Sequence, residues 1–166
     1  MIARTERLSL ELLGHEHAEG LFAAFDHPAI HTYLVAPEVT TLAALHERID
    51  HLARGPARDG ETWLNVVMRR LDDAVLVGRL EATCYPGWAE IAYLVGLAYQ
   101  RRGYAREGLQ WLLGELPSRG CSEIFAAIHP DNAASVGLVE NLGFTRRTVW
   151  QRDLASYEAG DLVLQL

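Results

Sequence analysis

The stretch Gln100-Arg101-Arg102-Gly103-Tyr104-Ala105 decides the fold predicted for this chain. It follows a segment, 89–97, that reads as a strand, and it opens a stripe of leucines at helical spacing. A glycine-bearing turn between a strand and a helix presents free backbone N–H groups at the positive end of the helix dipole, which suits a phosphate. Arg101, Arg102 and Arg106 add positive charge there. Taken alone, the turn is equally typical of an ordinary helix start with solvated arginines, so its neighbours must decide.

On both sides of the turn, the hydrophobic pattern changes its period several times. Alternating polar and apolar residues predict strands, and apolar residues three and four apart predict helices. Asp131 is the expected N-cap of the last helix, and Gly143 is its expected stop. The predicted elements are a strand at 7–12, helices at 15–25 and 40–54, strands at 63–68, 75–80 and 89–97, a helix at 105–116, a strand at 123–128, a helix at 131–141 and strands at 144–152 and 161–166. The three strands before the turn indicate an antiparallel meander.

Composition narrows the classes of protein. The chain has 166 residues, 49% of them hydrophobic, with no repeat or linker, which predicts one domain over 1–166. A formal net charge of −7 disfavours a nucleic-acid binder and suits a cationic partner such as an amine. All 15 Lys and Arg positions are arginine. The absence of lysine excludes Schiff-base enzymes and the nucleotide-binding loop that needs Gly-Lys-Ser/Thr.

The sequence lacks the features of a membrane protein, a secreted protein and a metal-binding protein. No apolar stretch reaches the roughly 20 residues that cross a bilayer, and residues 1–7 lack the apolar core of a secretory signal, so we expect a cytoplasmic protein without membrane contact. Cys84 and Cys121 are too few for a disulfide framework and are expected to be reduced thiols. Two histidine pairs, at 15 and 17 and at 27 and 31, have no cluster of Cys, His or Asp beside them, so no metal site is expected.

The residues around the turn resemble the GNAT superfamily of acetyltransferases, whose signature is Gln/Arg-x-x-Gly-x-Gly/Ala after the fourth strand. Here it stands as Gln100 to Ala105. The resemblance extends to Asn132-Ala133-Ala134-Ser135 and to Glu140-Asn141-Leu142-Gly143-Phe144, and to the order of elements over nearly the whole chain. Arg4-Thr5-Glu6-Arg7-Leu8-Ser9-Leu10 and Asn132-x-x-Ser135 are similar to the branch that acetylates ribosomal-protein N-termini, the RimJ/RimL type.

This resemblance implies an α+β fold in three layers, with a mixed, mostly antiparallel central sheet of about seven strands and about four helices. It implies acetyl-coenzyme A as cosubstrate, held where the fourth and fifth strands, 89–97 and 123–128, splay apart. The pantetheine arm would pair with the backbone of the fourth strand and hydrogen-bond Asn132, whose other possible role is a helix cap. The pyrophosphate would sit on the amides of 101–106. The implied cofactor-binding residues are Tyr93, Leu94, Val95, Gln100, Arg101, Arg102, Gly103, Tyr104, Ala105, Arg106, Asn132 and Ser135.

Acetyl transfer needs a neutral amine, donors for the developing oxyanion and a proton for the departing thiolate. Glu90 matches the catalytic glutamate of the histone-acetyltransferase branch, where the same Ala-Glu-Ile triplet opens the fourth strand; its alternative is a solvent-facing glutamate, and Glu81 is the reserve candidate. Ser135 is the expected acid, since many relatives carry a tyrosine seven residues after the asparagine and this chain has Val139. Another branch places its base five residues before the asparagine, where this chain has Ala127. The backbone N–H of Leu94 or Val95 would polarise the thioester carbonyl.

The expected acceptor is an amine, either on a small molecule or at a protein N-terminus. It would be chosen by segments 26–39 and 153–160, neither of which carries a readable code, and a homodimer is possible. The main alternative is a coenzyme A-binding sensor or partner-binding module that has lost catalysis, which the missing tyrosine favours. A nucleotide-phosphate binder of another fold is discouraged by the absent lysine and the preceding strands. Four aromatic residues either belong to the core or line the entrance of the acceptor site: Tyr33, Trp88, Trp150 and Tyr157.

Overall fold

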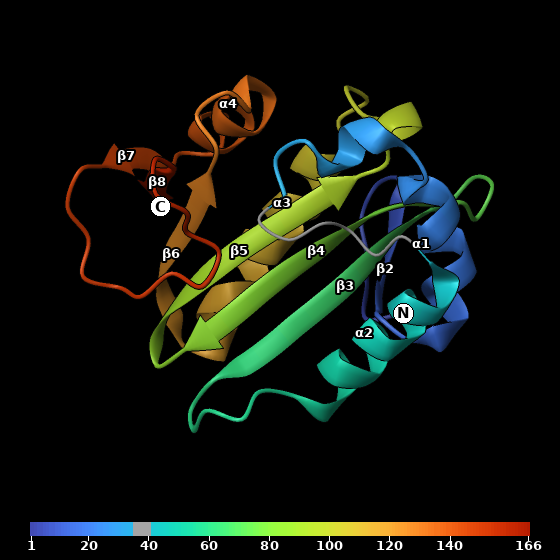
Figure 1. Cartoon of the computed structure of the whole chain (residues 1–166), viewed down its shortest axis with the longest axis horizontal. Coiled ribbons are helices and arrows are strands. Elements are labelled where there is room, and N and C mark those ends of the chain that lie inside the picture. The colour runs from blue at the N-terminus through green and yellow to red at the C-terminus, as the bar shows by residue number, and fades with distance from the viewer. Residues whose placement is uncertain (35–40) are drawn as a thin grey trace.

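The computed structural model describes residues 1–34 and 41–166, and all the strands in these residues form one sheet (Figure 1). The sheet has eight strands in the order β1-β2-β3-β4-β5-β6-β8-β7. Neighbouring strands pair antiparallel, except for β5 and β6, which run parallel. The strands are β1 (Ala3–Arg4), β2 (Leu8–Leu12), β3 (Thr62–Arg70), β4 (Leu76–Tyr85), β5 (Gly87–Val95), β6 (Cys121–Ile128), β7 (Thr145–Arg147) and β8 (Leu162–Gln165).

Helices cover both faces of this sheet, which gives three layers (Figure 1). The helices are α1 (Ala18–Phe25), α2 (Leu42–Arg54), α3 (Tyr104–Glu115) and α4 (Ala133–Asn141), with short 3-10 turns at His15–His17, Pro28–His31, Leu97–Tyr99 and Leu116–Arg119. Successive strand residues point to opposite faces, and β3 shows this directly. Val66 packs in the cluster that contains α3 and α4, whereas its neighbour Val67 packs against α1 and α2.

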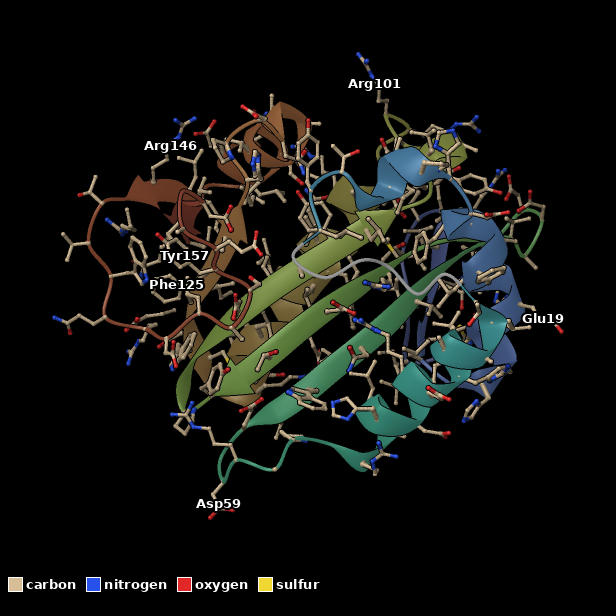
Figure 2. The ribbon with its side chains drawn as sticks, in the orientation of Figure 1. Glu19, Asp59, Arg101, Phe125, Arg146 and Tyr157 are labelled. Atoms are coloured by element: carbon tan, nitrogen blue, oxygen red, sulfur yellow. The ribbon has the colours of Figure 1, made fainter. Side chains whose placement is uncertain are left out.

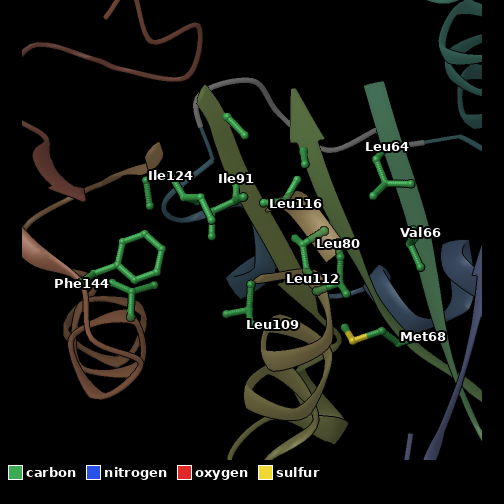
Figure 3. Packing of buried hydrophobic residues seen from close by; sticks show 14 of the residues in the cluster. Leu64, Val66, Met68, Leu80, Ile91, Leu109, Leu112, Leu116, Ile124 and Phe144 are labelled. Carbon is green, nitrogen blue, oxygen red and sulfur yellow. The ribbon is translucent and has the colours of Figure 1, made fainter. Parts of the chain in front are cut away.

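The larger core lies between the sheet and α3 (Figure 3). Leu109 and Leu112 of α3 are fully buried against Leu80 of β4 and Met68 of β3. Gly108, directly before Leu109, brings the helix close to the sheet, because a Cβ at this position would stand 2.5 Å from the Met68 sulfur. Such close packing fixes the height of α3 above the sheet. It therefore also fixes the turn from which α3 starts.

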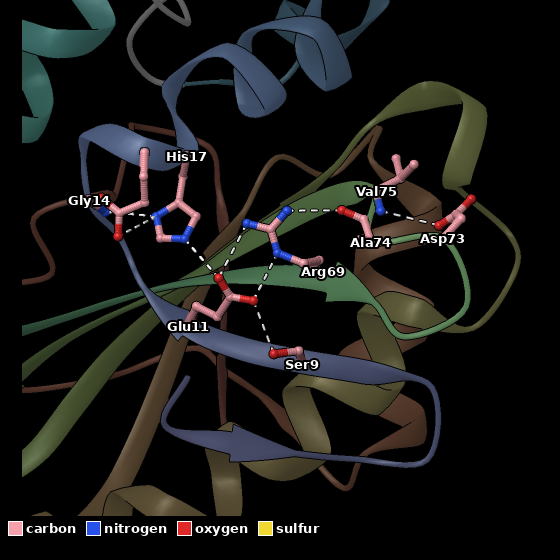
Figure 4. A network of polar contacts seen from close by, with 9 residues as sticks. Ser9, Glu11, Gly14, His17, Arg69, Asp73, Ala74 and Val75 are labelled. Atoms are coloured by element: carbon pink, nitrogen blue, oxygen red, sulfur yellow. Dashed lines mark hydrogen bonds and ion pairs between the residues drawn. The ribbon is translucent and has the colours of Figure 1, made fainter.

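A polar network secures β2 to β3 and to the start of α1 (Figure 4). The Glu11 carboxylate accepts hydrogen bonds from Arg69 at 2.9 Å and from the buried His17 at 2.9 Å. His17 Nδ1 accepts from the Gly14 amide at 3.0 Å, so Nε2 carries the proton that faces Glu11. Hydrogen bonds from Arg69 lower the pKa of Glu11 to about 2; burial opposes this, and bonds from His17 and Ser9 add to it. The network thus holds a partly buried carboxylate against two partners, Arg69 and His17.

The predicted order of elements is confirmed, with four local corrections. An eighth strand exists, because the two residues of β1 pair with β2. The strand predicted at 144–152 is only three residues long, since the chain leaves the sheet after Arg147. The strand predicted at 89–97 ends at Val95. A 3-10 turn lies between this strand and the glycine turn, so the strand does not run directly into the glycine turn. The N-cap of α4 is Asn132 rather than Asp131. None of the helices in the described residues is long and apolar enough to cross a membrane.

Candidate active site

The two parallel strands β5 and β6 separate in the middle of the sheet. Their pairing covers Gly87 to Glu90 on β5, and the last pair joins Glu90 to Phe125. Beyond it, β6 pairs only with β8 along its other edge, while β5 continues beside β4 as far as Val95. Figure 1 shows the two arrows diverging from this point. The edge of a strand that has no neighbouring strand keeps free N–H and C=O groups, and an extended ligand can form hydrogen bonds with them. The predicted splay is therefore present, and Tyr93, Leu94 and Val95 lie on its β5 side.

The turn from Gln100 to Ala105 connects the splayed end of β5 to α3. The Gln100 side-chain amide donates to the Val95 carbonyl at 3.0 Å, which ties the turn to the strand end. Gly103 is the N-cap of α3, with a φ of 85° and no side-chain cap. The first amides of the helix therefore keep their donors free of intrahelical acceptors, at the positive end of the helix dipole. Arg101, Arg102 and Gly103 are exposed, and Figure 2 shows Arg101 extending from the turn into solvent.

The turn is held from behind by Arg7, which sequence reasoning did not assign to the site. Arg7 Nη1 donates to the Arg102 carbonyl at 2.9 Å, and the guanidinium lies 4.9 Å from the centre of the Tyr104 ring. Glu107 on α3 orients Arg7, since its carboxylate accepts from Arg7 Nε and from the Arg7 amide, both at 2.7 Å. Burial alone would raise the pKa of Glu107, but hydrogen bonds from Thr5 and Arg7 outweigh it and hold the pKa below its ordinary value. No local pattern reveals this contact, because its partners lie about a hundred residues apart.

The start of α4 faces the splay from the side of β6. Asn132 caps the helix, with Oδ1 accepting the Ser135 amide at 3.2 Å. The cap role that the sequence left open for Asn132 is thus present, and its Nδ2 group is not part of that bond. Ser135 Oγ lies 2.8 Å from the Tyr93 hydroxyl of β5. Ser135 of α4 is therefore in contact with the splayed strand, and Asn132 lies in the same cap.

Glu90 stands where the pairing of β5 and β6 ends, but it does not face open solvent. Its side chain is among the buried charged groups, 5% exposed, which excludes the predicted alternative of a solvent-facing glutamate. Oε2 accepts from the Ala155 amide at 2.8 Å, and Oε1 accepts from the amide of Ser156 at 3.0 Å and from its hydroxyl. Glu90 therefore anchors the segment that follows β7 over the sheet. Oε2 keeps one lone pair free of these bonds.

A cleft of about 260 Å³ opens on this face, beside the end of the pairing. Glu81 on β4 shares the cleft with Glu90; its Oε1 contacts Arg48 of α2 and Arg79 of β4, each at 3.0 Å. The charges of the cleft are therefore mixed rather than purely acidic. Its walls are formed by Glu81, Thr83, Glu90, Ile91, Ala92, Ala155 and Ser156.

The aromatic residues expected at an acceptor mouth divide into two groups. Trp88 is core: it stacks on Tyr85 at 4.1 Å and meets the edge of Phe125. Tyr157 is 37% exposed and packs against Trp150 at 5.1 Å, on the segment that Glu90 anchors. Tyr33, 43% exposed, contacts His129 at the end of β6. Part of the predicted selector segment 26–39 lies outside the described residues.

Two features of the expected chemistry can be checked directly. Val139 is fully buried, so this position of α4 contributes only to the core. Within residues 1–34 and 41–166, no three His, Cys, Asp or Glu side chains gather closely enough to hold a metal ion.

Comparison with known proteins agrees with this geometry. Residues 7–145 match the model of the acetyltransferase (GNAT) domain family. Over 51 residues the chain is 39% identical to the [ribosomal protein bS18]-alanine N-acetyltransferase of Escherichia coli K12, an alignment that covers 31% of this chain and only 34% of that enzyme. RimL, a ribosomal L7/L12 alpha-N-protein acetyltransferase solved with coenzyme A, has the same fold with a TM-score of 0.80, 19% identity and coverage of 99% and 96% of the two chains.

A second similar structure is the microcin C7 self-immunity acetyltransferase MccE, solved with acetyl-CoA and AMP. It superposes with a TM-score of 0.80 at 15% identity, over 97% of this chain and 92% of that one. Identities this low establish the fold alone, whereas the family match spans most of the chain and confirms the predicted family. The chain belongs to the GNAT acetyltransferase family.

Proposed function

We propose that this protein transfers an acetyl group from acetyl-coenzyme A to a primary amine, by direct attack of the neutral amine on the thioester. One observation carries the proposal: the pairing of β5 and β6 stops at Glu90, so that the cleft and the splay adjoin along β5, whose far end leads through a 3-10 turn to the glycine turn. A donor thioester in the splay and an acceptor in the cleft would then meet at the same stretch of β5.

The residues present fit the cosubstrate. A pyrophosphate needs several N–H donors, positive charge and room for close backbone approach. The first turn of α3 offers free amides, and Gly103 has no side chain to block them. Arg101, Arg102 and Arg106 surround this helix start with positive charge in an acidic protein. In the proposed complex the unpaired edge of β5 binds the pantetheine arm through Tyr93, Leu94 and Val95, and Asn132 donates to it from the other side.

The acceptor amine is assigned to the cleft. Glu90 Oε2 is the proposed base, acting on the ammonium directly or through a water molecule, and Glu81 is the reserve. As the nitrogen attacks, the C–N bond forms, and the amide of Val95 stabilises the charge on the carbonyl oxygen, since the alternating ladder directs the other candidate amide, that of Leu94, towards β4. The C–S bond then breaks with its electrons on sulfur, and Ser135 protonates the thiolate. Glu90 and Ser135 are the proposed catalytic residues.

A protein N-terminus is the acceptor we favour, with a small-molecule amine as the second possibility. The curated relative acts on ribosomal protein bS18 and RimL acts on L7/L12, by their names. The mixed charge of the cleft suits a backbone-like acceptor, because an α-amine is followed by a peptide carbonyl that needs donors such as Arg48.

Thiol release from acetyl-CoA tests the proposal. Peptides that begin with alanine or serine should release coenzyme A, while the same peptides with an acetylated N-terminus should release none. Small polyamines and amino sugars form the comparison panel. Absence of thiol release with every amine, together with no thermal stabilisation at saturating acetyl-CoA, would reject the function.

A coenzyme A-binding sensor without catalysis is the second candidate. The observation that favours it is that the Glu90 carboxylate already accepts hydrogen bonds from two backbone amides and a hydroxyl. A sensor would be stabilised by acetyl-CoA in a thermal shift and would release no thiol with any acceptor. The single domain over 1–166, the cytoplasmic location and the homodimer stay predictions.

A further inference from the structure

The residue that this inference concerns is Tyr93, which crosses the splay from β5 to α4. Its backbone is part of the splayed strand, but its side chain packs at the edge of the core that contains α3 and α4. The phenol oxygen lies 2.8 Å from Ser135 Oγ and 3.3 Å from the Ser135 carbonyl. The hydroxyl pair thus joins the strand that would hold the thioester to the helix that would hold the pantetheine.

Ser135 alone is a weak source of protons. An aliphatic hydroxyl is far less acidic than a phenol, whose ordinary pKa is about 10, or a thiol, at about 8.5. A serine that gives its proton to a thiolate must recover one at the same time, or an alkoxide forms. The nearest hydroxyl that can supply it is that of Tyr93, and the 2.8 Å contact allows either oxygen to be the donor.

We propose that Tyr93 acts through Ser135, orienting its hydroxyl and returning the proton that Ser135 gives to the departing thiolate. The inference rests on the proposed function. When the C–S bond breaks, sulfur takes the Ser135 proton and Ser135 Oγ takes the Tyr93 proton in the same step. The attacking nitrogen gives its proton to Glu90, which releases it to solvent, and the tyrosinate that remains takes one proton back from solvent. Overall, acetyl-coenzyme A and an amine yield an amide and the free thiol, with no net proton consumed.

The environment of Tyr93 supports this role. Burial raises the pKa of the phenol, and the hydrogen bond to Ser135 offsets only part of the rise, so the group carries its proton at neutral pH. Both residues are half-buried rather than sealed in the core. Val139 on the same helix supplies no competing hydroxyl.

Single-turnover acetylation of the peptide found active provides the test, with Tyr93→Phe, Ser135→Ala and the double variant compared. We expect Tyr93→Phe to lower the acetyl-transfer rate about tenfold to a hundredfold while the Kd for acetyl-CoA changes less than about twofold. Because the two residues act in one relay, the double variant should be no slower than Ser135→Ala. Tyr85→Phe is the matched control, since Tyr85 stacks on Trp88 in a separate cluster, and it should keep the wild-type rate.

A second readout separates the relay from a structural role. In mixtures of H₂O and D₂O, the transfer of two protons in one step makes the wild-type rate depend on the deuterium fraction along a curve. In Tyr93→Phe only the Ser135 proton is transferred, so the dependence should be linear. A linear wild-type dependence, an unchanged rate in Tyr93→Phe, or losses that multiply in the double variant would each overturn the relay. The wild-type measurement decides even where Tyr93→Phe fails to fold. If Ser135→Ala transfers acetyl as fast as an active wild type, Ser135 is not the acid, and the relay through it is rejected as well. An inactive wild type would instead reject the proposed function itself.

Discussion

The Arg7 guanidinium donates to the carbonyl of Arg102 at 2.9 Å and thereby fastens the β1–β2 connection to the turn in front of α3. The carbonyl belongs to the residue just before Gly103, so this bond fixes the peptide whose neighbours would face the pyrophosphate. Glu107 completes the arrangement by holding both the amide and Nε of Arg7. Arg7 thus shapes the proposed cofactor site without being one of its expected ligands.

Replacing Arg7 by alanine should weaken acetyl-CoA binding and leave the chemical step nearly unchanged. A hydrogen bond from a charged donor contributes about 1.5–3 kcal/mol when it is buried, and less here because the Arg7 side chain is 44% exposed. We therefore expect the KM for acetyl-CoA to rise about threefold to tenfold at constant kcat. Arg4→Ala, which removes an exposed arginine of β1, is the control. Equal KM values for the two variants would show that Arg7 does not shape the turn.

Gly103→Ala tests the turn itself. The φ of 85° lies in the left-handed region, where a Cβ costs about 1–2 kcal/mol, and the new methyl group would stand 3.1 Å from Arg7 Nη2. We expect a lower melting temperature and a rise of tenfold or more in the Kd for coenzyme A, measured by calorimetry. Gly114→Ala is the matched control within α3, since a Cβ there meets nothing within 4 Å. That variant should be slightly more stable, because alanine favours a helix by about 1 kcal/mol over glycine.

The sequence predicted what depends on local pattern. The turn and the helix that follows it are each determined within a few residues and are present, whereas the cap of α4 is Asn132, one residue after the predicted Asp131. The predicted strand at 144–152 was wrong over most of its length, because a local pattern does not show whether a strand has a partner. Its apolar residues indicate a strand, but strand pairing depends on a partner, and of this segment only Thr145 to Arg147 pair with β8. Val149 beyond them is 80% exposed.

Contacts between distant parts of the chain could not be predicted in this way. Arg7 and Glu107 meet only because α3 lies beside β2 in the folded sheet, and neither residue has a local motif. Glu90 was identified from its triplet, yet its anchoring of Ser156 depends on the path of the chain after β7. The contact of Tyr93 with Ser135 has the same origin: the strand and the helix were both predicted, but not which of their side chains touch.

Glu90→Gln separates a catalytic from an anchoring role of this carboxylate. The amide can still accept from Ser156 through its oxygen, but its NH₂ group would face the Ala155 amide, so one buried hydrogen bond is lost at a cost of about 1–3 kcal/mol. If Glu90 is the base, kcat should fall at least tenfold while the KM for acetyl-CoA stays within about twofold. Ser156→Ala is the comparison, because it removes the hydroxyl contact and keeps both amides. Full activity of Glu90→Gln would transfer the role of base to Glu81, and equal losses in both variants would indicate that Glu90 acts by anchoring the segment.

The Glu11 network should control stability in acid. The pKa of Glu11 is lowered from 4.5 to about 2, chiefly by Arg69, so the folded chain binds the proton less tightly than the unfolded chain does. The network's contribution is therefore fully present above about pH 4.5 and is lost progressively as the pH falls towards 2. Glu11→Gln should flatten the decrease in unfolding free energy between these values, as measured by urea denaturation at a series of pH values, and should be less stable than the wild type at pH 7. Glu19→Gln, an exposed substitution on α1 that Figure 2 shows directed into solvent, should retain the wild-type slope. A Glu11→Gln profile parallel to that of the wild type would mean that Arg69 and His17 do not hold this carboxylate in its ionised form.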